Sequence, residues 1–290
     1  MKIYFGIGTT EAQLAPSYLL KKSLFKHSEG MNIDVSNICD EPEAKKLNLY
    51  ANLSLGTVFS LQRFLVCEIA KRKKADVAIY IDSDIICMNS YSPMIKLFYN
   101  SEDDFYIPTS NKLFQQPVQT AVTIMKVSDD NLNFFNEILA LYFKGQVNYQ
   151  QAISDFYKNR KYTFIGHKYN SRDFFEDDTV FLHYTDLWTQ PWVSSFRKEG
   201  SVWKNEHQKL MSVDNEYFKL VKDGVLNKYY KPDMLDLSFA SYVKSLIFLP
   251  PQFAVYFNRN SFLRFFPKSF LGISTQLVGF FRAFFNIRTT

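Results

Sequence analysis

Residues 77–84 read VAIYIDSD, an uninterrupted apolar run that leads directly into two aspartates separated by a serine. A run of this kind is typical of a strand buried on both faces of a parallel sheet. Ligands of such sheets bind beyond the carboxyl ends of the strands, so Asp82 and Asp84 stand where chemistry is expected. The stretch therefore predicts an α/β protein with a ligand site at this edge of its sheet.

The chain on both sides of this stretch alternates between strand and helix patterns. We expect strands over residues 2–8, 31–38, 105–108, 121–127 and 179–182, and helices over residues 14–25, 57–74, 131–143 and 150–157. This order predicts a Rossmann-like, mostly parallel central sheet flanked by helices. No GxGxxG follows the first strand, because Gly6-Ile7-Gly8 alone is too short a match, so a dinucleotide dehydrogenase is disfavoured.

Composition describes a globular protein. The chain has 290 residues, 47% hydrophobic and 22% charged, which fits one large domain with an appendage or two small domains. Its three cysteines, Cys39, Cys67 and Cys87, cannot complete a disulfide framework and include no CxxC pair, so we expect a reducing compartment. The N-terminal apolar run is too short for a secretory signal, which predicts a cytoplasmic protein.

The charge is divided unevenly along the chain. Residues 241–290 hold six basic residues, no acidic residue and eleven phenylalanines, whereas the first 240 hold 28 basic and 29 acidic residues. This pattern argues against a nucleic-acid binder and predicts a main domain over residues 1–235 with a helical basic aromatic segment over residues 236–290. Pro250-Pro251 and Arg282 interrupt the apolar runs, so a membrane span is not predicted.

A segment that mixes phenylalanine with lysine and arginine is typical of an interfacial anchor. We therefore expect the protein to lie peripherally on the anionic inner face of the cell membrane. The alternative is a C-terminal hairpin packed on the body of the protein.

Asp82, Asp84 and His183 are the candidate metal ligands. Two acids at i and i+2 in a turn can reach one divalent cation together with nucleotide phosphates, and an oxygen-rich set favours Mn²⁺ or Mg²⁺. His183 follows the apolar residues 179–182, so it too is expected at a strand end, and imidazole is a good third ligand. The alternatives are an aspartate pair that caps a turn and a histidine hydrogen-bonded in the core.

Two segments carry a resemblance to a known family. IYIDSDIICMNSYSPMIKLF, residues 79–98, resembles the DxD region of the GT-A nucleotide-sugar glycosyltransferases of retaining family 8, which include glycogenin and bacterial lipooligosaccharide galactosyltransferases. FLHYTDLWTQPW, residues 181–192, is similar to that family's metal-histidine motif, HxxGxxKPW. The resemblance covers about residues 1–200, and SLQRFLVCEIA, residues 60–70, fits the family's order.

The resemblance implies roles for individual residues. It makes Asp82, Asp84 and His183 metal ligands, and it places Asp84 and Gln150 in the catalytic centre, with Gln150 near the anomeric carbon. The residues implied in nucleotide or sugar binding are Thr9, Thr10, Arg63, Asp82, Ser83 and Gln190. The alternatives for Gln150 and Arg63 are solvent-facing helix residues.

The chain also departs from the family pattern. Asp186 replaces a glycine, and Gln190 stands where a diphosphate-binding lysine is expected, which removes a cation that Arg197, Lys198 or Lys204 would have to replace. Tyr149-Gln150-Gln151 replaces Asp-Gln-Asp, and residues 120–122 replace an Asn-x-Gly element. These departures leave the identity of the donor sugar open.

The resemblance predicts a metal-dependent glycosyltransferase. It would move a hexose from UDP-galactose or UDP-glucose to a saccharide or lipid-linked acceptor, with retention of configuration, in the synthesis of lipopolysaccharide, capsule or another cell-surface polysaccharide. One rival is a metal-dependent nucleotidyltransferase, which would consume a nucleoside triphosphate in place of a nucleotide sugar. A second is a non-catalytic, membrane-associated GT-A-like protein, which would bind neither metal nor nucleotide.

Overall fold

The computed structural model describes residues 1–48, 58–109, 120–154, 156–158, 160–186, 188–194, 199–235, 238–249, 273 and 276–278. The chain forms two compact units, one of residues 1–11 and 20–183 and the other of residues 12–19 and 184–290. The basic aromatic segment predicted over residues 236–290 falls largely outside the described residues, so it and its boundary at residue 235 stay predictions.

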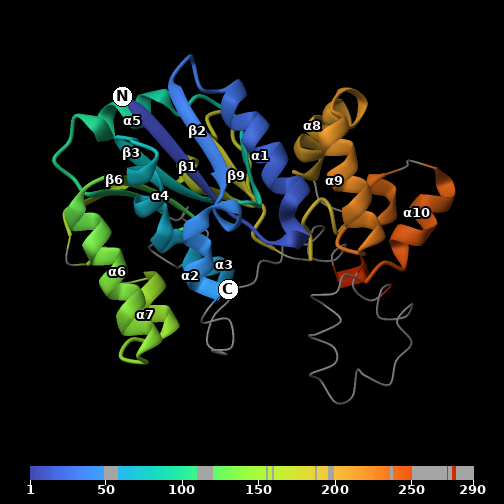
Figure 1. Ribbon diagram of the computed structural model, residues 1–290. Helices are drawn as coiled ribbons and strands as arrows, with labels where there is room; N and C mark the ends of the chain where they lie inside the picture. The colour runs from blue at the N-terminus through green and yellow to red at the C-terminus, as the bar shows by residue number, and fades with distance from the viewer. Residues whose placement is uncertain are drawn as a thin grey trace. The chain divides into compact units, whose positions relative to one another are not determined.

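The first unit is built on a six-stranded sheet in the order β2-β1-β3-β6-β5-β7 (Figure 1). Its strands are β1 (Lys2–Gly8), β2 (Asn32–Asn37), β3 (Val77–Asp82), β5 (Phe105–Pro108), β6 (Val122–Lys126) and β7 (Tyr162–Ile165). The β1–β2, β1–β3 and β5–β7 pairs are parallel, and β6 runs antiparallel to both of its neighbours. The predicted mostly parallel α/β sheet is therefore confirmed.

Helices cover both faces of this sheet. They are α1 (Leu14–Lys26), α2 (Lys45–Asn48), α3 (Val58–Leu61), α4 (Val66–Arg72), α5 (Ser92–Tyr99), α6 (Asp129–Phe143) and α7 (Tyr149–Ser154), with short 3-10 turns at Glu11–Gln13, Ile38–Asp40, Pro42–Ala44, Gln62–Leu65 and His167–Asn170. The helix predicted over residues 57–74 is interrupted by the turn at Gln62–Leu65, which directs Gln62 and Arg63 toward the carboxyl end of the sheet.

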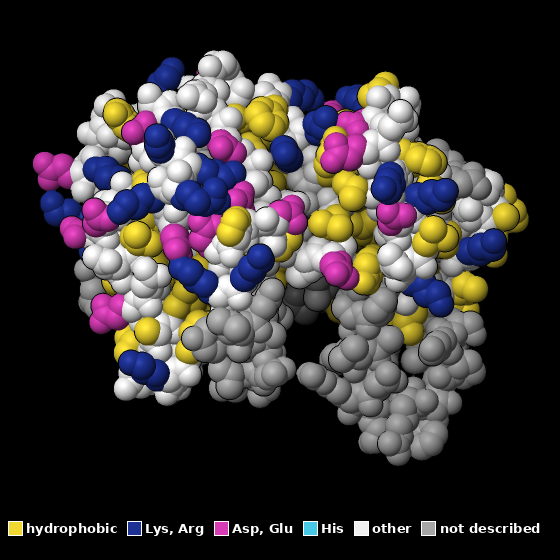
Figure 2. Space-filling model, viewed as in Figure 1, with side chains coloured by type: hydrophobic (Ala, Val, Ile, Leu, Met, Phe, Trp, Pro, Cys, Tyr) yellow, Lys and Arg dark blue, Asp and Glu magenta, His cyan; other side chains and the backbone are white. Residues whose placement is uncertain are grey.

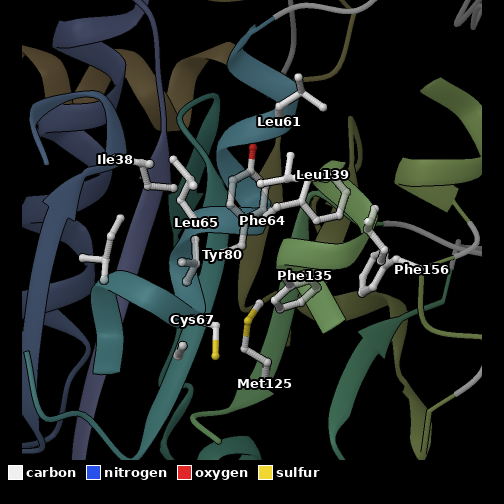
Figure 3. Packing of buried hydrophobic residues seen from close by; sticks show 14 of the residues in the cluster. Ile38, Leu61, Phe64, Leu65, Cys67, Tyr80, Met125, Phe135, Leu139 and Phe156 are labelled. Carbon is white, nitrogen blue, oxygen red and sulfur yellow. The ribbon is translucent and has the colours of Figure 1, made fainter. Parts of the chain in front are cut away.

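Successive side chains of a strand point to opposite faces of the sheet, so the strands contribute to two hydrophobic cores, one on each face. Tyr4 and Tyr80 face one core with α4, α6 and α7, where Phe64, Phe135 and Phe156 pack together (Figure 3). A second core with α1 and α5 is faced by alternate residues of the same strands, Ile3, Phe5 and Ile7 of β1 and Val77, Ile79 and Ile81 of β3. The side chains of β3 from Val77 to Ile81 are at most 1% exposed, as expected for a strand covered on both faces.

A second, small sheet holds β4 (Ile85–Cys87), β9 (Phe181–His183) and β8 (Ser171–Arg172). β4 pairs antiparallel with β9, and β8 pairs parallel with β9. The sequence predicts the strand near residues 179–182, and the structure extends it to His183. β4 and β8 are not predicted because two or three residues are too few to show a period. β7, at the edge of the larger sheet, is not predicted either.

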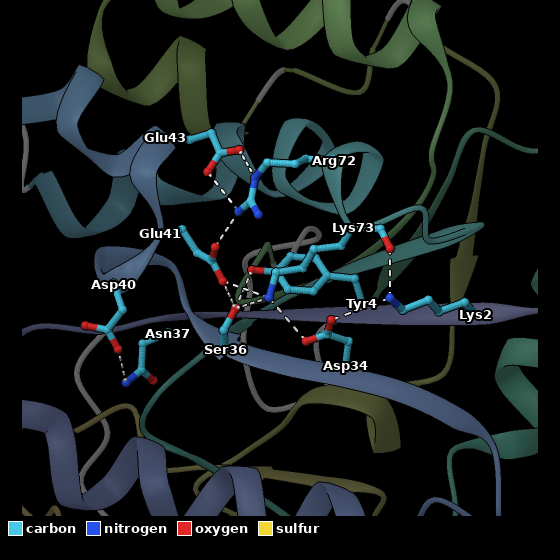
Figure 4. Close-up of polar contacts among 10 residues, drawn as sticks. All are labelled: Lys2, Tyr4, Asp34, Ser36, Asn37, Asp40, Glu41, Glu43, Arg72 and Lys73. Carbon is cyan, nitrogen blue, oxygen red and sulfur yellow. Dashed lines mark hydrogen bonds and ion pairs between the residues drawn. The ribbon is translucent and has the colours of Figure 1, made fainter.

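Ion pairs fix the end of α4 beside β2 (Figure 4). Arg72 pairs with Glu41 and Glu43, and Lys73 pairs with Glu41 at 2.8 Å and with Asp34 at 3.2 Å. Burial acts to raise the pKa of Glu41, but the hydrogen bonds that it receives outweigh burial and hold that pKa below its usual range. The basic run at the end of this helix therefore binds specific carboxylates in addition to meeting the helix dipole.

The second unit is helical in its described parts. It contains α8 (Gly200–Val213), α9 (Asn215–Leu226), a 3-10 turn at Pro232–Met234 and α10 (Phe239–Leu246). Trp203 lies between Trp192 and His207 in its core, with ring centroids 5.5 and 5.1 Å away. Among the described residues, no helix is both long enough and apolar enough to cross a membrane.

Candidate metal centre

The backbone of the aspartate pair is fixed by the strands on either side of β3. The Asp82 amide donates to the Ala121 carbonyl at 2.9 Å, and the Ser83 amide donates to the Gly8 carbonyl at 3.0 Å. These bonds continue the sheet past the end of β3 and turn the chain so that Asp84 leads into β4. The pair thus lies at the carboxyl end of the sheet, as predicted.

His183 lies beside the same aspartate pair, although it is far from that pair in the sequence. Because β9 pairs with β4, His183 lies opposite Ile85, the residue after Asp84. Its Nε2 atom is 3.1 Å from Asp84 Oδ1. One ligand atom from each of Asp82, Asp84 and His183 lies within 4.8 Å of the others. The aspartate pair and His183, about a hundred positions apart in the sequence, thus come together as predicted, and their binding of a metal stays a prediction.

The tautomer of His183 is set by Asn170. The Asn170 side-chain oxygen accepts a hydrogen bond from His183 Nδ1 at 2.8 Å, and both side chains are buried. In the neutral ring, Nδ1 therefore holds the proton and the lone pair of Nε2 points toward the Asp84 carboxylate. A lone pair and a carboxylate at this distance repel each other unless a proton on Nε2 or a bound metal ion lies between them.

This donor set fits a divalent ion. Two ligands at right angles on an octahedral ion with bonds of about 2.1 Å are roughly 3 Å apart, close to the separation of His183 Nε2 and Asp84 Oδ1. Two carboxylates with one imidazole, oriented through its other nitrogen, are a normal set for such a metal.

The charges at the site influence one another strongly. Burial raises the pKa of Asp82 to about 6; the Arg63 guanidinium acts to lower it, and the Asp84 carboxylate adds to the increase. Burial alone would lower the pKa of His183, but the carboxylates of Asp84, Asp82 and Asp173 together outweigh burial, and the net direction is upward. A concentration of negative charge inside the protein thus faces the imidazole.

Tyr80 holds Asp82 in place. The Tyr80 hydroxyl donates to Asp82 Oδ1 at 2.5 Å, and the Arg63 guanidinium lies 4.8 Å from the centre of the Tyr80 ring. Arg63 also donates to the carbonyls of Ser60 and Thr120. The structure therefore buries Arg63 beside the aspartates, which excludes the alternative of a solvent-facing arginine; its contact with a sugar stays a prediction.

Hydrogen bonds hold the loop after β1 beside the aspartates. The Gln62 side-chain amide makes two 3.0 Å hydrogen bonds with the backbone of Thr9, one to its amide and one to its carbonyl. Thr9 is buried and Thr10 is exposed, and they follow Gly8, which pairs with Asp82. Ser83 is also buried, and its hydroxyl has no hydrogen-bond partner among the described residues.

Two predicted residues are not brought to this cluster by the contacts of the first unit. Gln150 lies on α7 with an exposed side chain. Gln190 belongs to the second unit, where its buried amide donates to the Tyr184 carbonyl at 3.1 Å. Their roles in binding and catalysis stay predictions. Arg197 and Lys198 lie outside the described residues.

Sequence reasoning missed the residues that orient the ligands, Tyr80, Asn170 and Gln62. Tyr80 had a weak signal, since it precedes Asp82 by two positions and so lies on the same face of β3. Asn170 had no signal, because it reaches His183 through a turn and a two-residue strand.

Comparison with solved structures connects this geometry to known proteins. The glycosyltransferase GlyE of Streptococcus pneumoniae TIGR4 superposes with a TM-score of 0.52 at 14% identity over 79% of this chain and 64% of its own, slightly less than two thirds of its length. The galactosyltransferase LgtC, in complex with donor and acceptor sugar analogs, gives a TM-score of 0.50 at 14% identity over 76% of this chain and 100% of its own. The chain has the GT-A glycosyltransferase fold. No protein-family model and no curated protein matches the sequence.

Proposed function

We propose that this GT-A protein is a metal-dependent glycosyltransferase that transfers a hexose from a nucleotide-diphosphate sugar. The observation that carries the proposal is the convergence of Asp82, Asp84 and His183 at the carboxyl end of the sheet. In a fold of this kind that edge is where a nucleotide binds. The predicted ligands and the fold thus support one reaction class.

The residues of the site would each contribute to the departure of the nucleotide diphosphate. Asp82, Asp84 and His183 would hold Mn²⁺ or Mg²⁺, which supplies a positive charge for the diphosphate as it leaves. Tyr80 and Asn170 would keep a carboxylate and the imidazole oriented toward that ion. Thr9, Thr10 and Ser83 border the same turn and would contact the nucleotide.

The reaction we propose proceeds with retention. The acceptor hydroxyl would attack the anomeric carbon from the face that the diphosphate leaves, and a diphosphate oxygen would take its proton. Gln150 would support the positive sugar through its carbonyl oxygen, because an amide does not titrate and cannot act as a general base. Arg63 would face the donor sugar.

The donor that we propose is UDP-galactose or UDP-glucose, and the acceptor a saccharide or lipid-linked sugar in cell-surface polysaccharide synthesis. The similarity in fold to a galactosyltransferase supports a hexose donor. Thermal-shift titration of the protein with UDP-sugars, with and without Mn²⁺, tests nucleotide and metal together. A stabilisation that needs both is expected.

The catalytic test compares variants at the metal centre with a matched control. Asp84→Ala and His183→Ala should each lower hydrolysis and transfer of the donor sugar by at least about a hundredfold, because each removes a ligand. His167→Ala removes a half-exposed histidine that pairs with Glu176 and should leave the rate within about twofold. Full activity of the wild type in a chelator rejects the metal-dependent mechanism.

The same assay must distinguish the proposed glycosyltransferase from a nucleotidyltransferase. It would consume nucleoside triphosphates and leave UDP-sugars intact, so both donor classes are supplied to the same preparation. Gln150→Ala should slow transfer with a smaller change in donor affinity, since we place Gln150 near the sugar and not the diphosphate. Rapid triphosphate turnover with no turnover of UDP-sugar overturns the proposal.

We also propose that the C-terminal part of the chain attaches the protein to an anionic membrane surface. On α10, Phe239, Tyr242, Val243 and Leu246 repeat at helical spacing; the first three are exposed, and Lys244 is exposed as well. Hydrophobic and basic side chains are both visible on the surface in the region of α10 (Figure 2). The basic, phenylalanine-rich sequence after residue 249 adds to this support.

Sedimentation with lipid vesicles tests this attachment. The protein should pellet with vesicles that contain phosphatidylglycerol at low salt and be released by high salt, because the attraction is screened. Phe239→Ser with Tyr242→Ser should weaken pelleting several-fold, whereas Phe218→Ser, at an exposed position of α9, should not. Absence of wild-type binding at low salt contradicts the attachment.

A further inference from the structure

The proposed reaction needs a cation for the diphosphate at a site where the chain lacks the expected lysine. Gln190 stands at that position, is uncharged, and uses its buried amide to bind the Tyr184 carbonyl. Arg63 is already engaged by the carbonyls of Ser60 and Thr120 and by the Tyr80 ring. The proposed reaction therefore calls for another positive side chain of the first unit near the metal centre.

Arg172 lies directly beside the metal ligands in the small sheet. In the pairing of β8 with β9, Arg172 is opposite His183, and in the pairing of β9 with β4, His183 is opposite Ile85. Directly opposed residues of neighbouring strands, about 4.8 Å apart, project their side chains from the same face. The Arg172 side chain therefore projects from the strand next to that of His183 and from the same face of the small sheet.

The charge of Arg172 interacts with the carboxylate of Asp84, one of the candidate metal ligands. Burial acts to lower the pKa of this guanidinium, and Asp173 and Asp84 act in the opposite direction. Arg172 is thus a partly buried cation whose electrostatic partners include one of the metal ligands. Arginine stays protonated in such a place, so its charge is permanent.

The backbone around Arg172 is held firmly. The Asp173 amide donates to the His183 carbonyl at 2.8 Å, and Asp173 has a φ of 56°, a left-handed conformation that ends the strand. Asn170, two residues earlier, binds the His183 ring. One short segment therefore orients the imidazole and places a guanidinium beside it.

We propose that Arg172 binds the diphosphate of the donor and supplies the positive charge that Gln190 does not. This inference rests on the proposed function. A guanidinium has five donors in a planar fork that can pair with two phosphate oxygens at once, which a single ammonium group cannot do in the same way. Arg172 would hold the diphosphate in the ground state and stabilise it as it leaves.

The test compares Arg172→Gln with Lys168→Gln. Lys168 lies in the turn that precedes β8, forms a partly exposed ion pair with Asp178 at 3.4 Å, and its replacement removes the same charge. UDP, GDP and ADP are titrated into the wild type with Mn²⁺ by calorimetry, and the tightest-binding nucleotide is then used for both variants. Mn²⁺ alone is titrated into each protein as well.

We expect Arg172→Gln to weaken nucleotide diphosphate binding about 10- to 100-fold, as for the loss of charged hydrogen bonds, and to leave Mn²⁺ affinity unchanged or tighter, because a nearby positive charge has been removed. Lys168→Gln should bind the nucleotide within about twofold of the wild type. A loss of nucleotide affinity without a loss of Mn²⁺ affinity separates a diphosphate contact from a purely structural role.

Two results overturn this inference while leaving the proposed function standing. One is a nucleotide affinity of Arg172→Gln equal to that of the wild type. The other is weaker Mn²⁺ binding by Arg172→Gln, which would mean that Arg172 only positions Asp84 or His183. Failure of the wild type to bind any of the three nucleotides with Mn²⁺ would reject the proposed function and this inference together.

Discussion

Two of the three proposed metal ligands, Asp82 and His183, depend on a second residue for their orientation. Asp82 receives a hydrogen bond from Tyr80, and His183 donates one to Asn170. Without Asn170 the imidazole could rotate or adopt the other tautomer, and its lone pair would no longer point toward Asp84. Such partners of metal ligands typically account for 10- to 100-fold in metal affinity.

Asn170→Ala should therefore weaken Mn²⁺ binding about 10- to 100-fold while the protein stays folded. The control is Asn131→Ala, which removes a fully buried asparagine that binds the Lys126 carbonyl and Arg160, away from the three ligands. Asn131→Ala should lower the free energy of unfolding without changing Mn²⁺ affinity. Calorimetric titration of Mn²⁺ into both variants measures this, and equal affinities would contradict the role of Asn170.

Among the secondary-structure elements, the close approach of β1 to β3 requires a glycine at position 8. Gly8 pairs with Asp82 across the two strands, and a Cβ atom at residue 8 would lie 2.8 Å from Cζ of Tyr80 and closer still to its hydroxyl. The Tyr80 ring cannot yield easily, because it is buried and Arg63 lies over it. A side chain at this position would displace the hydroxyl from Asp82.

Gly8→Ala should lower the free energy of unfolding by about 1–3 kcal/mol through overpacking and also weaken Mn²⁺ binding about tenfold or more. Gly6→Ala is the matched control on the same strand, because its Cβ would meet the ends of the Val66 and Ile38 side chains, not Tyr80. It should destabilise the fold and leave Mn²⁺ affinity intact. Parallel urea denaturation and Mn²⁺ titration distinguish the two, and unchanged Mn²⁺ binding in Gly8→Ala contradicts the argument.

At the scale of the whole molecule, the stability of the second unit depends on a histidine that is buried in its neutral form. His207 Nδ1 accepts a hydrogen bond from the Tyr217 hydroxyl at 2.9 Å, and Nε2 donates to the Met234 carbonyl at 3.0 Å. Burial lowers the pKa of His207 to about 4. Protonation would break the bond that Nδ1 accepts, so the folded protein resists it.

Stability should therefore fall as the pH falls from about 6.5 to 4. In that interval the unfolded chain takes up a proton that the folded chain refuses, and the contribution lost is at most about 3 kcal/mol. His207→Gln can keep both hydrogen bonds but cannot titrate, so its free energy of unfolding should fall less over the same interval. Urea denaturation followed by tryptophan fluorescence, which Trp203 stacked on His207 makes sensitive to this region, measures the difference. Identical pH dependence in both proteins contradicts this role.

The sequence predicted the centre of the first unit well because β1 and β3 are covered on both faces. Residues 77–81 of β3 and residues 2–8 of β1 read as apolar runs, and the structure buries nearly all of them. The second unit was not predicted, since its helices α8 and α9 carry many charged residues and few buried ones. The interruption of the helix predicted over residues 57–74 was also missed, because its cause is the contacts of Gln62 and Arg63 with distant residues.

The amino-acid sequence by itself determined the α/β class, the strand that ends in Asp82, and the identities of the three candidate metal ligands, because these follow from local hydrophobic pattern and side-chain chemistry. Only the tertiary structure brought His183 to Asp84, placed Tyr80, Asn170 and Arg172 around them, and set the tautomer of the imidazole. Those relations depend on the pairing of β4, β8 and β9, strands too short to leave a periodic signal. Contacts between residues far apart in sequence are fixed by the packing of the whole unit and not by any local pattern.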